Sequence, residues 1–262
     1  MFINKVEIED TFAEAFQMYG TRLIITAVSE KWAMTTAQVV TGFATSVIGC
    51  GCEAGIEGIL EKTPDGRPGV SVLFFAMSKK ELEKQMMRRL GQGIMTAPST
   101  ACYNGLDAPD RIDIGGKIRF FGDGFQISKL VDGIRYWRIP VMEGEFIVEE
   151  SVGMKKSVGG GNFLILGEDL NHTLEAAELA VEAIRGMEGI ALPFPGGIVR
   201  SGSKVGSKYK FLSASTNTAY CPTIRNQVDS ALSADIGCVL EIVINGLEEE
   251  AVKEATSVGI RA

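Results

Sequence analysis

The sequence has one histidine, His172, among 262 residues, and this scarcity excludes whole classes of catalytic site. A zinc site built from several histidines is impossible, and a Ser–His or Cys–His nucleophile pair could exist only if His172 supplied the base. His172 lies near the expected start of an amphipathic helix, which favours a capping or surface role. We therefore expect no metal site.

Cysteine is also scarce, and phosphate-binding motifs are absent. The five cysteines are odd in number and scattered, which predicts free thiols rather than a disulfide framework. Cys50-Gly-Cys52 lacks CxxC spacing, and there is no GxxxxGK[ST] motif. Neither Gly49-Cys-Gly51 nor Gly159-Gly-Gly-Asn162 makes a dinucleotide-binding fingerprint. These absences predict that no cofactor is permanently bound.

Basic residues are outnumbered, with 26 Lys and Arg against 33 Asp and Glu and a net charge of −7. A nucleic-acid partner is not predicted, because such proteins carry a basic surface. No apolar run approaches the roughly 20 residues that a membrane helix needs. The N-terminal segment MFINKVEIEDTFAEAF has acidic residues where a signal peptide would have lysines. We expect a cytoplasmic protein without a membrane segment.

What the sequence contains is a repeated order of strands and helices. In the first half, hydrophobic periodicity predicts a strand at 22–28, a helix at 30–46, a strand within 47–60, a strand at 70–76, a helix at 79–90 and a strand at 117–121. Ser29 and Ser78 stand where helix N-caps are expected. The order β-α-β-β-α-β is that of ferredoxin-like folds.

The second half repeats this order, with a strand at 162–166, a helix at 174–187, a strand-like segment at 189–199, a strand at 239–244 and a helix at 248–258. The parallel predicts an α+β protein with two ferredoxin-like (βαββαβ) lobes in tandem, residues 1–146 and 147–262. The second lobe is expected to lack its closing strand, because the sequence stops at Ala262 after the last helix.

One carboxylate interrupts an apolar strand. Glu241 lies within 239–244, and strand alternation places Val239, Glu241 and Val243 on one face. Loss of hydration there favours the neutral form of the acid, which can donate a hydrogen bond to an oxyanion. The residues alone leave open a second interpretation, in which Glu241 lies at a sheet rim or pairs with a Lys or Arg.

A second feature is electrostatic. Residues 189–228 contain no Asp or Glu but five cations, namely Arg200, Lys204, Lys208, Lys210 and Arg225. A net-acidic protein that binds a polyanionic ligand needs such a local positive region, and glycines let backbone N–H groups approach an anion. A solvated basic loop is equally compatible with the pattern.

Several long sequence motifs match those of one protein family and occur in the same order along the chain. They include VEIEDTFAEAF (6–16), TPDGRPG (63–69), GGNF (160–163), PFPGGIV (193–199), SKVG (203–206), ASTN (214–217) and EIVING (241–246). From Ile3 to Ala262 the chain resembles formylmethanofuran–tetrahydromethanopterin formyltransferases of one-carbon metabolism.

The resemblance implies reversible formyl transfer from formylmethanofuran to N5 of tetrahydromethanopterin, in methanogenesis or C1 oxidation. It also implies two ferredoxin-like lobes, no prosthetic group, and a homodimer or homotetramer with a methanofuran cleft at a subunit interface. The family's buried, protonated glutamate, which stabilises the tetrahedral oxyanion, is matched by Glu241. The matching motifs contain the candidate substrate-binding residues Asn162, Phe163, Phe194, Ser203 and Lys204.

The chain also departs from the family pattern. Gly51-Cys52 replaces a Pro-Ala pair, Gly93 replaces a cysteine, and Arg200 stands where the family has alanine. Family chains continue past the match to Ala262, so residues 162–166 are expected to form an unpaired strand edge. The alternative to an active enzyme is therefore a formyltransferase-like paralogue that binds the coenzymes or a partner chain without turnover.

Overall fold

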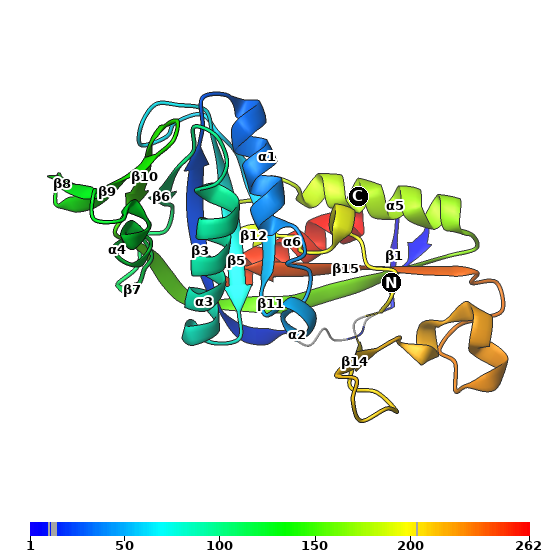
Figure 1. Ribbon diagram of the computed structural model, residues 1–262. Coiled ribbons are helices and arrows are strands. Elements are labelled where there is room, and N and C mark those ends of the chain that lie inside the picture. The colour runs from blue at the N-terminus through cyan, green and yellow to red at the C-terminus, as the bar shows by residue number, and fades with distance from the viewer. Residues whose placement is uncertain (10, 12–14, 203) are drawn as a thin grey trace.

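A computed structural model describes residues 1–262 except 10, 12–14 and 203, and one large sheet runs through its two α+β lobes (Figure 1). The first lobe contains β3 (Phe16–Thr26), α1 (Glu30–Thr41), β4 (Glu53–Leu60), β5 (Gly69–Ala76), α3 (Lys79–Arg89) and β6 (Ala101–Asn104). These strands lie side by side in the order β4-β5-β3-β6. The expected β-α-β-β-α-β order of this lobe is therefore present.

The second lobe contains β11 (Ser151–Gly167), α5 (Leu170–Ile184), β12 (Ile190–Ala191), β15 (Cys238–Gly246) and α6 (Glu249–Arg261). Strand β15 lies between β12 and β11. The long strand β11 joins the lobes, because residues 155–159 pair with β3 and residues 161–167 pair with β15. Among the described strands, β15 is the only partner of residues 161–167, which agrees with the open edge expected there.

The remaining strands extend the first lobe and form small hairpins. They are β1 (Phe2–Ile3), β2 (Val6–Glu7), β7 (Asp110–Asp113), β8 (Ile127–Val131), β9 (Ile134–Val141), β10 (Gly144–Glu149), β13 (Lys204–Val205) and β14 (Ala214–Ser215). Strand β10 pairs with β9 along its length and with β6 at Ile147 and Val148, and it continues across residue 146, the expected end of the first lobe. Within the described residues, no helix is both long and apolar enough to cross a bilayer.

Local capping sets where the helices begin. The Ser29 side chain accepts a hydrogen bond from the Trp32 N–H at the start of α1, and Ser78 does the same for the Glu81 N–H of α3. Each bond satisfies a backbone donor that has no partner within the helix. Both expected N-caps are confirmed.

Two strand predictions are wrong. Residues 117–121 instead form α4 (Gly115–Ile118) and the 3₁₀ turn η2 (Arg119–Gly122). The backbone N–H groups of residues 114–116 all donate to the Glu150 carbonyl, which starts a helical turn, and the Arg119 guanidinium lies over the rings of Phe120 and Trp137. The fourth strand of the lobe is β6 instead.

The second error concerns Val47 and Ile48, which belong to the short helix α2 (Val47–Cys50) and not to a strand. Ser46 caps this helix, and Gly51 ends it with a φ of 85°, a conformation that glycine adopts without strain. The strand-like segment 189–199 is also shorter than expected. Only Ile190–Ala191 is strand, because Pro193 and Pro195 cannot donate to a ladder.

Three apolar clusters hold the lobes together. Helices α1 and α3 cover one face of the first-lobe strands, while α5 and α6 cover one face of β11 and β15 (Figure 1). The third cluster lies between the lobes, where Met18 and Phe75 meet Ala191 and Leu247. The opposite face of β15, away from α5 and α6, carries the polar residues described next.

Candidate functional site

Glu241 lies at the middle of β15 and is 4% exposed. On one side of it is Leu164 of β11. On the other, the Val199 N–H donates to the Glu241 carbonyl at 2.8 Å, and the Glu241 N–H donates back at 2.9 Å. Backbone partners on both sides place Glu241 inside the sheet, which excludes the interpretation that it lies at a rim.

Asn162 holds the Glu241 side chain. Its amide Nδ2 donates to Glu241 Oε1 at 2.6 Å. Asn162 pairs across the ladder with Val243, two residues from Glu241, so the two side chains share one face of the sheet. The structure therefore brings together the candidate catalytic residue and one of the candidate substrate-binding residues.

Glu241 lines a small hollow of about 40 Å³. The exposed Arg200 lines it, so one cation lies at the same opening as the acid. Its other lining residues are Leu164, Val199, Gly202, Thr216, Asn217, Tyr220, Cys221, Val239 and Leu240. Thr216, Asn217, Tyr220 and Cys221 were not predicted to belong to the site, although the ASTN motif contains two of them.

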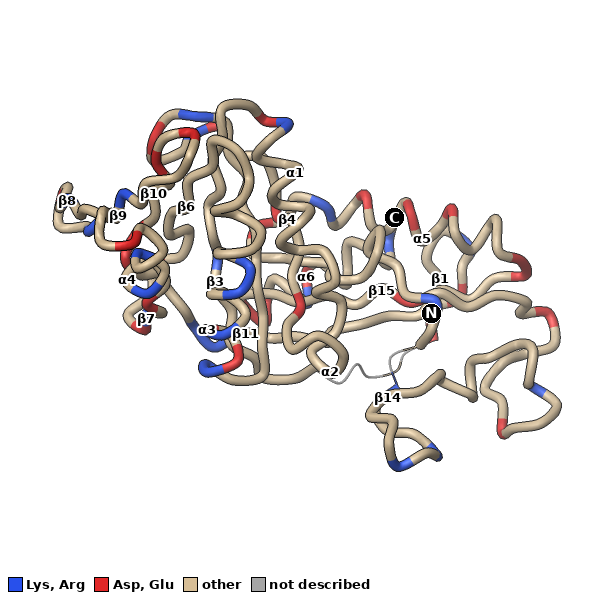
Figure 2. Tube along the Cα trace, viewed as in Figure 1, with Lys and Arg blue, Asp and Glu red and all other residues tan. Residues whose placement is uncertain are grey.

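The segment that carries β13 and β14 projects from the second lobe (Figure 1). Its residues Gly202, Thr216 and Asn217 line one side of the hollow. The segment bears Lys and Arg but no Asp or Glu (Figure 2). Lys204 lies here, exposed and paired across the hairpin with Ser215. Ser203, which precedes it, lies outside the described residues. The acid-free segment is thus a basic surface next to Glu241.

Two other candidate residues are not gathered at Glu241. Phe163 is on the opposite face of β11, in the cluster beneath α5 and α6, where Ile184 and Gly259 are its neighbours. Phe194 is half-buried, and its carbonyl accepts a hydrogen bond from the Gly197 N–H in a 3₁₀ turn, η3 (Pro195–Gly197). The structure thus separates Phe163 from Asn162, although they are adjacent in sequence.

The single histidine and the cysteines behave as the sequence predicts. His172 is exposed in the first turn of α5, and its hydrogen bond with Asp169 raises the pKa of the imidazole. All five cysteines are free thiols. Burial raises the pKa of the Cys52 thiol to about 11, which disfavours a nucleophilic thiolate there. In the described part of the chain, no three His, Cys, Asp or Glu side chains are placed to hold a metal ion.

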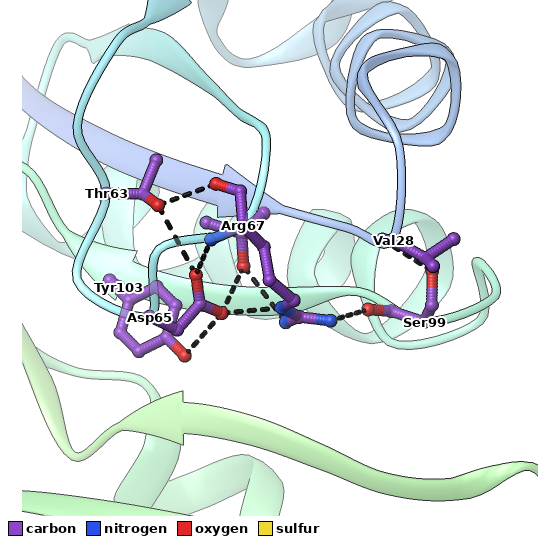
Figure 3. A network of polar contacts seen from close by, with 7 residues as sticks. Val28, Thr63, Asp65, Arg67, Ser99 and Tyr103 are labelled. Carbon is purple, nitrogen blue, oxygen red and sulfur yellow. Dashed lines mark hydrogen bonds and ion pairs between the residues drawn. The ribbon is translucent and has the colours of Figure 1, made fainter.

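A second polar network lies at the turn formed by TPDGRPG (Figure 3). Asp65 Oδ2 accepts from the Thr26 and Tyr103 hydroxyl groups at 2.8 and 3.0 Å and from Arg67 Nε at 2.7 Å. Burial opposes ionisation of Asp65, but the hydrogen bonds from Thr26 and Arg67 outweigh it and lower the pKa of this carboxyl. Arg67 also donates to the Ser99 carbonyl at 2.6 Å. The TPDGRPG motif therefore anchors a turn to strands β3 and β6, and it does not line the hollow.

Comparisons with known proteins give one consistent result. Residues 1–141 match the family model described as formylmethanofuran–tetrahydromethanopterin formyltransferase, and residues 144–262 match the model of the proximal lobe of the same family. A formylmethanofuran–tetrahydromethanopterin formyltransferase from Methylococcus capsulatus is 56% identical over 264 residues, which cover 100% of this chain and 89% of the relative.

Solved structures agree with this result. One is the formyltransferase/hydrolase complex (FhcABCD) of Methylorubrum extorquens with methylofuran, of which one chain superposes with a TM-score of 0.96 at 52% identity, covering 100% of this chain and 87% of its own. The other is the formyltransferase of Methanosarcina barkeri, with a TM-score of 0.94, 47% identity and coverages of 100% and 90%.

Proposed function

Because the chain belongs to the formylmethanofuran–tetrahydromethanopterin formyltransferase family, we propose that it transfers a formyl group between formylmethanofuran and N5 of tetrahydromethanopterin. The two coenzymes are substrates, and no prosthetic group takes part. The observation that carries the proposal is the family match along the whole chain, combined with a buried acid, Glu241, held by an amide beside an open hollow.

The chemistry needs no protein nucleophile. The N5 lone pair attacks the formyl carbon, the bond from that carbon to the methanofuran amine breaks, and the N5 proton ends on the leaving amine. Between these events the formyl oxygen carries negative charge. Glu241 in its neutral form donates a hydrogen bond to that oxygen, while its other oxygen accepts from Asn162. The protein supplies alignment and a preorganised donor.

The basic segment has a matching role in this proposal. Arg200 lines the hollow, and Lys204 lies on the segment that borders it, where cations attract the carboxylates of the coenzymes. The same Arg200 also favours a second candidate function, because it places a long charged side chain at the opening. In that candidate the chain binds the coenzymes or a partner chain without turnover.

The finer architecture is also a proposal. We propose two ferredoxin-like lobes, 1–146 and 147–262, supported by the order β4-β5-β3-β6 in the first and by the position of β15 between β12 and β11 in the second. We further propose a homodimer or homotetramer in the cytoplasm. The free thiols in the described residues support a reducing compartment.

The proposal is tested with purified protein, both coenzymes and the change in the pterin spectrum on formylation. Glu241→Ala should lower kcat by about 10²–10³-fold, because one oxyanion donor is lost. Glu241→Gln retains a donor and should retain part of the activity. Glu254→Ala, a change on the exposed face of α6, is the matched control.

Turnover of Glu241→Ala at the wild-type rate would refute the assignment of Glu241. Absence of transfer by the wild-type protein, together with a rise in Tm on adding the coenzymes, would instead establish the binding-only function.

A further inference from the structure

Strand β11 contains a bulge just before Asn162. Val158 pairs with Gly246 of β15, but Gly161 pairs with Ile244, so Gly159 and Gly160 together stand opposite the single residue Asn245. Gly160 has a φ of 81°, which a glycine adopts freely. A β-carbon on Gly159 would lie 2.0 Å from Met18 Sδ, so a side chain at this position would require the buried Met18 side chain to move.

The bulge determines which side chain faces Glu241. If the pairing of Val158 with Gly246 continued without it, Phe163 would stand opposite Glu241 and Asn162 would lie on the helix-covered face. With the bulge, Leu164 stands opposite Glu241, and Asn162 shares its face and donates to it. One extra residue in β11 thus places an amide, rather than an aromatic ring, beside the acid.

The Asn245 side chain fastens this bulge. Its Oδ1 accepts from the Gly160 N–H at 2.9 Å, and the residue is completely buried. A backbone N–H can only donate, so this contact fixes the amide with its oxygen toward Gly160. The Nδ2 group must then point away from the bulge, and it donates to Glu53 Oε2 at 2.6 Å.

Glu53 completes the chain of contacts from the other lobe. It begins β4 and is 8% exposed, and its Oε1 accepts from the Val47 N–H at the start of α2 at 3.1 Å. Both Glu53 oxygens therefore accept from donors whose direction is fixed. The contacts link α2 and β4 of the first lobe to β15 and the β11 bulge of the second.

We propose that Glu53 and Asn245 are positioning residues for the reaction: they hold the Gly159–Gly160 bulge, and through it they hold Asn162 against Glu241. The proposal rests on the proposed formyl transfer, because the acid that they serve is the proposed oxyanion donor. Neither residue lines the hollow. Both act through the register of β11.

An exchange of the carboxylate and amide groups between positions 53 and 245 tests the proposed positioning role. In Glu53→Gln, the new amide nitrogen must face either Asn245 Nδ2 or the Val47 N–H, and each is a donor. In Asn245→Asp, a carboxylate oxygen faces Glu53. In the double variant all three contacts return, because the new glutamine amide donates to the new carboxylate while their oxygens accept from Val47 and Gly160. Side-chain size is nearly unchanged throughout.

Each single variant should lower kcat by at least about tenfold, the scale of one unsatisfied buried polar contact, while KM for both coenzymes changes by less than about twofold. The double variant should recover at least half of wild-type kcat. Hydrogen exchange of the Gly160 amide is the second readout, and it should accelerate in the single variants and slow again in the double variant. Glu254→Gln and Asn171→Asp, the same chemical changes at exposed positions, are the controls.

Single variants with wild-type kcat and a lower Tm would overturn the proposal, because Glu53 and Asn245 would then contribute only to stability. A double variant no better than the single variants would also overturn it. If a single variant fails to fold, a folded and active double variant supports the coupling, and an unfolded one refutes it. Absence of transfer by the wild-type protein would refute the proposed function, whereas the Gly160 exchange arm would still decide the link between the pair and the bulge.

Discussion

Asn162→Ala would measure how much the hold on Glu241 contributes to the reaction. The deleted amide donates to Glu241 Oε1 at 2.6 Å. Removing the donor to a buried, neutral carboxyl oxygen costs about 1–3 kcal/mol. If that whole amount serves to aim the acid at the developing oxyanion, the barrier rises by the same amount, and 1.36 kcal/mol corresponds to a tenfold change in rate. The expected loss in kcat is therefore roughly 5- to 160-fold.

Asn162 is also a candidate substrate-binding residue, but its amide donates to a protein acid, so we expect kcat rather than KM to change in this variant. The assay is the initial rate of N5 formylation over a range of both coenzyme concentrations, with Tm recorded for each protein. Asn171→Ala removes an amide of the same size from the exposed face of α5 and should keep wild-type kinetics.

A kcat within twofold of the wild-type value would refute the reasoning, provided that Glu241→Ala is strongly impaired in the same assay. Glu241 would then reach its catalytic orientation without the amide. A large rise in KM at constant kcat would also contradict it, since Asn162 would then bind substrate rather than orient the acid.

Three further predictions concern residues outside the hollow. Phe163→Ala should lower the free energy of unfolding by about 2 kcal/mol, less than for a fully buried phenylalanine, and leave KM unchanged, which urea denaturation and kinetics would check. Arg67→Ala should lower the free energy of unfolding by about 1–3 kcal/mol without changing kcat, because the contacts of Arg67 with Asp65 and the Ser99 carbonyl are lost. Burial raises the pKa of Glu149 in the folded protein. Its stabilising contribution is therefore complete below the ordinary glutamate pKa and declines as the pH rises through the raised value, so the Tm of Glu149→Gln minus that of wild type should increase from about pH 4 to about pH 7. A constant difference would refute this reading of Glu149.

Elements that depend on local interactions could be predicted from the sequence. Ser29 and Ser78 are followed at once by helices, and each cap needs only a donor three residues away. Glu241 was recognisable because a carboxylate inside an apolar strand is expensive to bury and therefore informative. The strand predicted at 117–121 failed because its partners are distant. The Glu150 carbonyl and the Trp137 ring, which organise α4 and η2, follow much later in the chain.

The arrangement of the site could not be read from the sequence for a similar reason. Local alternation shows that Asn162 and Phe163 lie on opposite faces of a strand, but not which of the two faces Glu241. The answer depends on the number of residues in β11 between Val158 and the pairing with Ile244 of β15. The run of three glycines at 159–161 is the one signal in the sequence, because glycine inside a strand often marks a bulge.

The motifs GGNF and EIVING therefore form one structural unit. The two motifs pair with each other across β11 and β15. The asparagine of each motif makes a hydrogen bond to the other motif: Asn162 donates to Glu241, and Asn245 accepts from Gly160. A substitution in either motif that keeps its own strand intact can still shift the register between β11 and β15 and turn Asn162 away from Glu241. Glu53 extends this dependence to the first lobe, because from β4 it accepts the hydrogen bond that the Asn245 amide donates. The position of the proposed oxyanion donor is thus a property of the contact between the lobes, and a second lobe produced alone would retain Glu241 but lose the carboxylate that orders its surroundings.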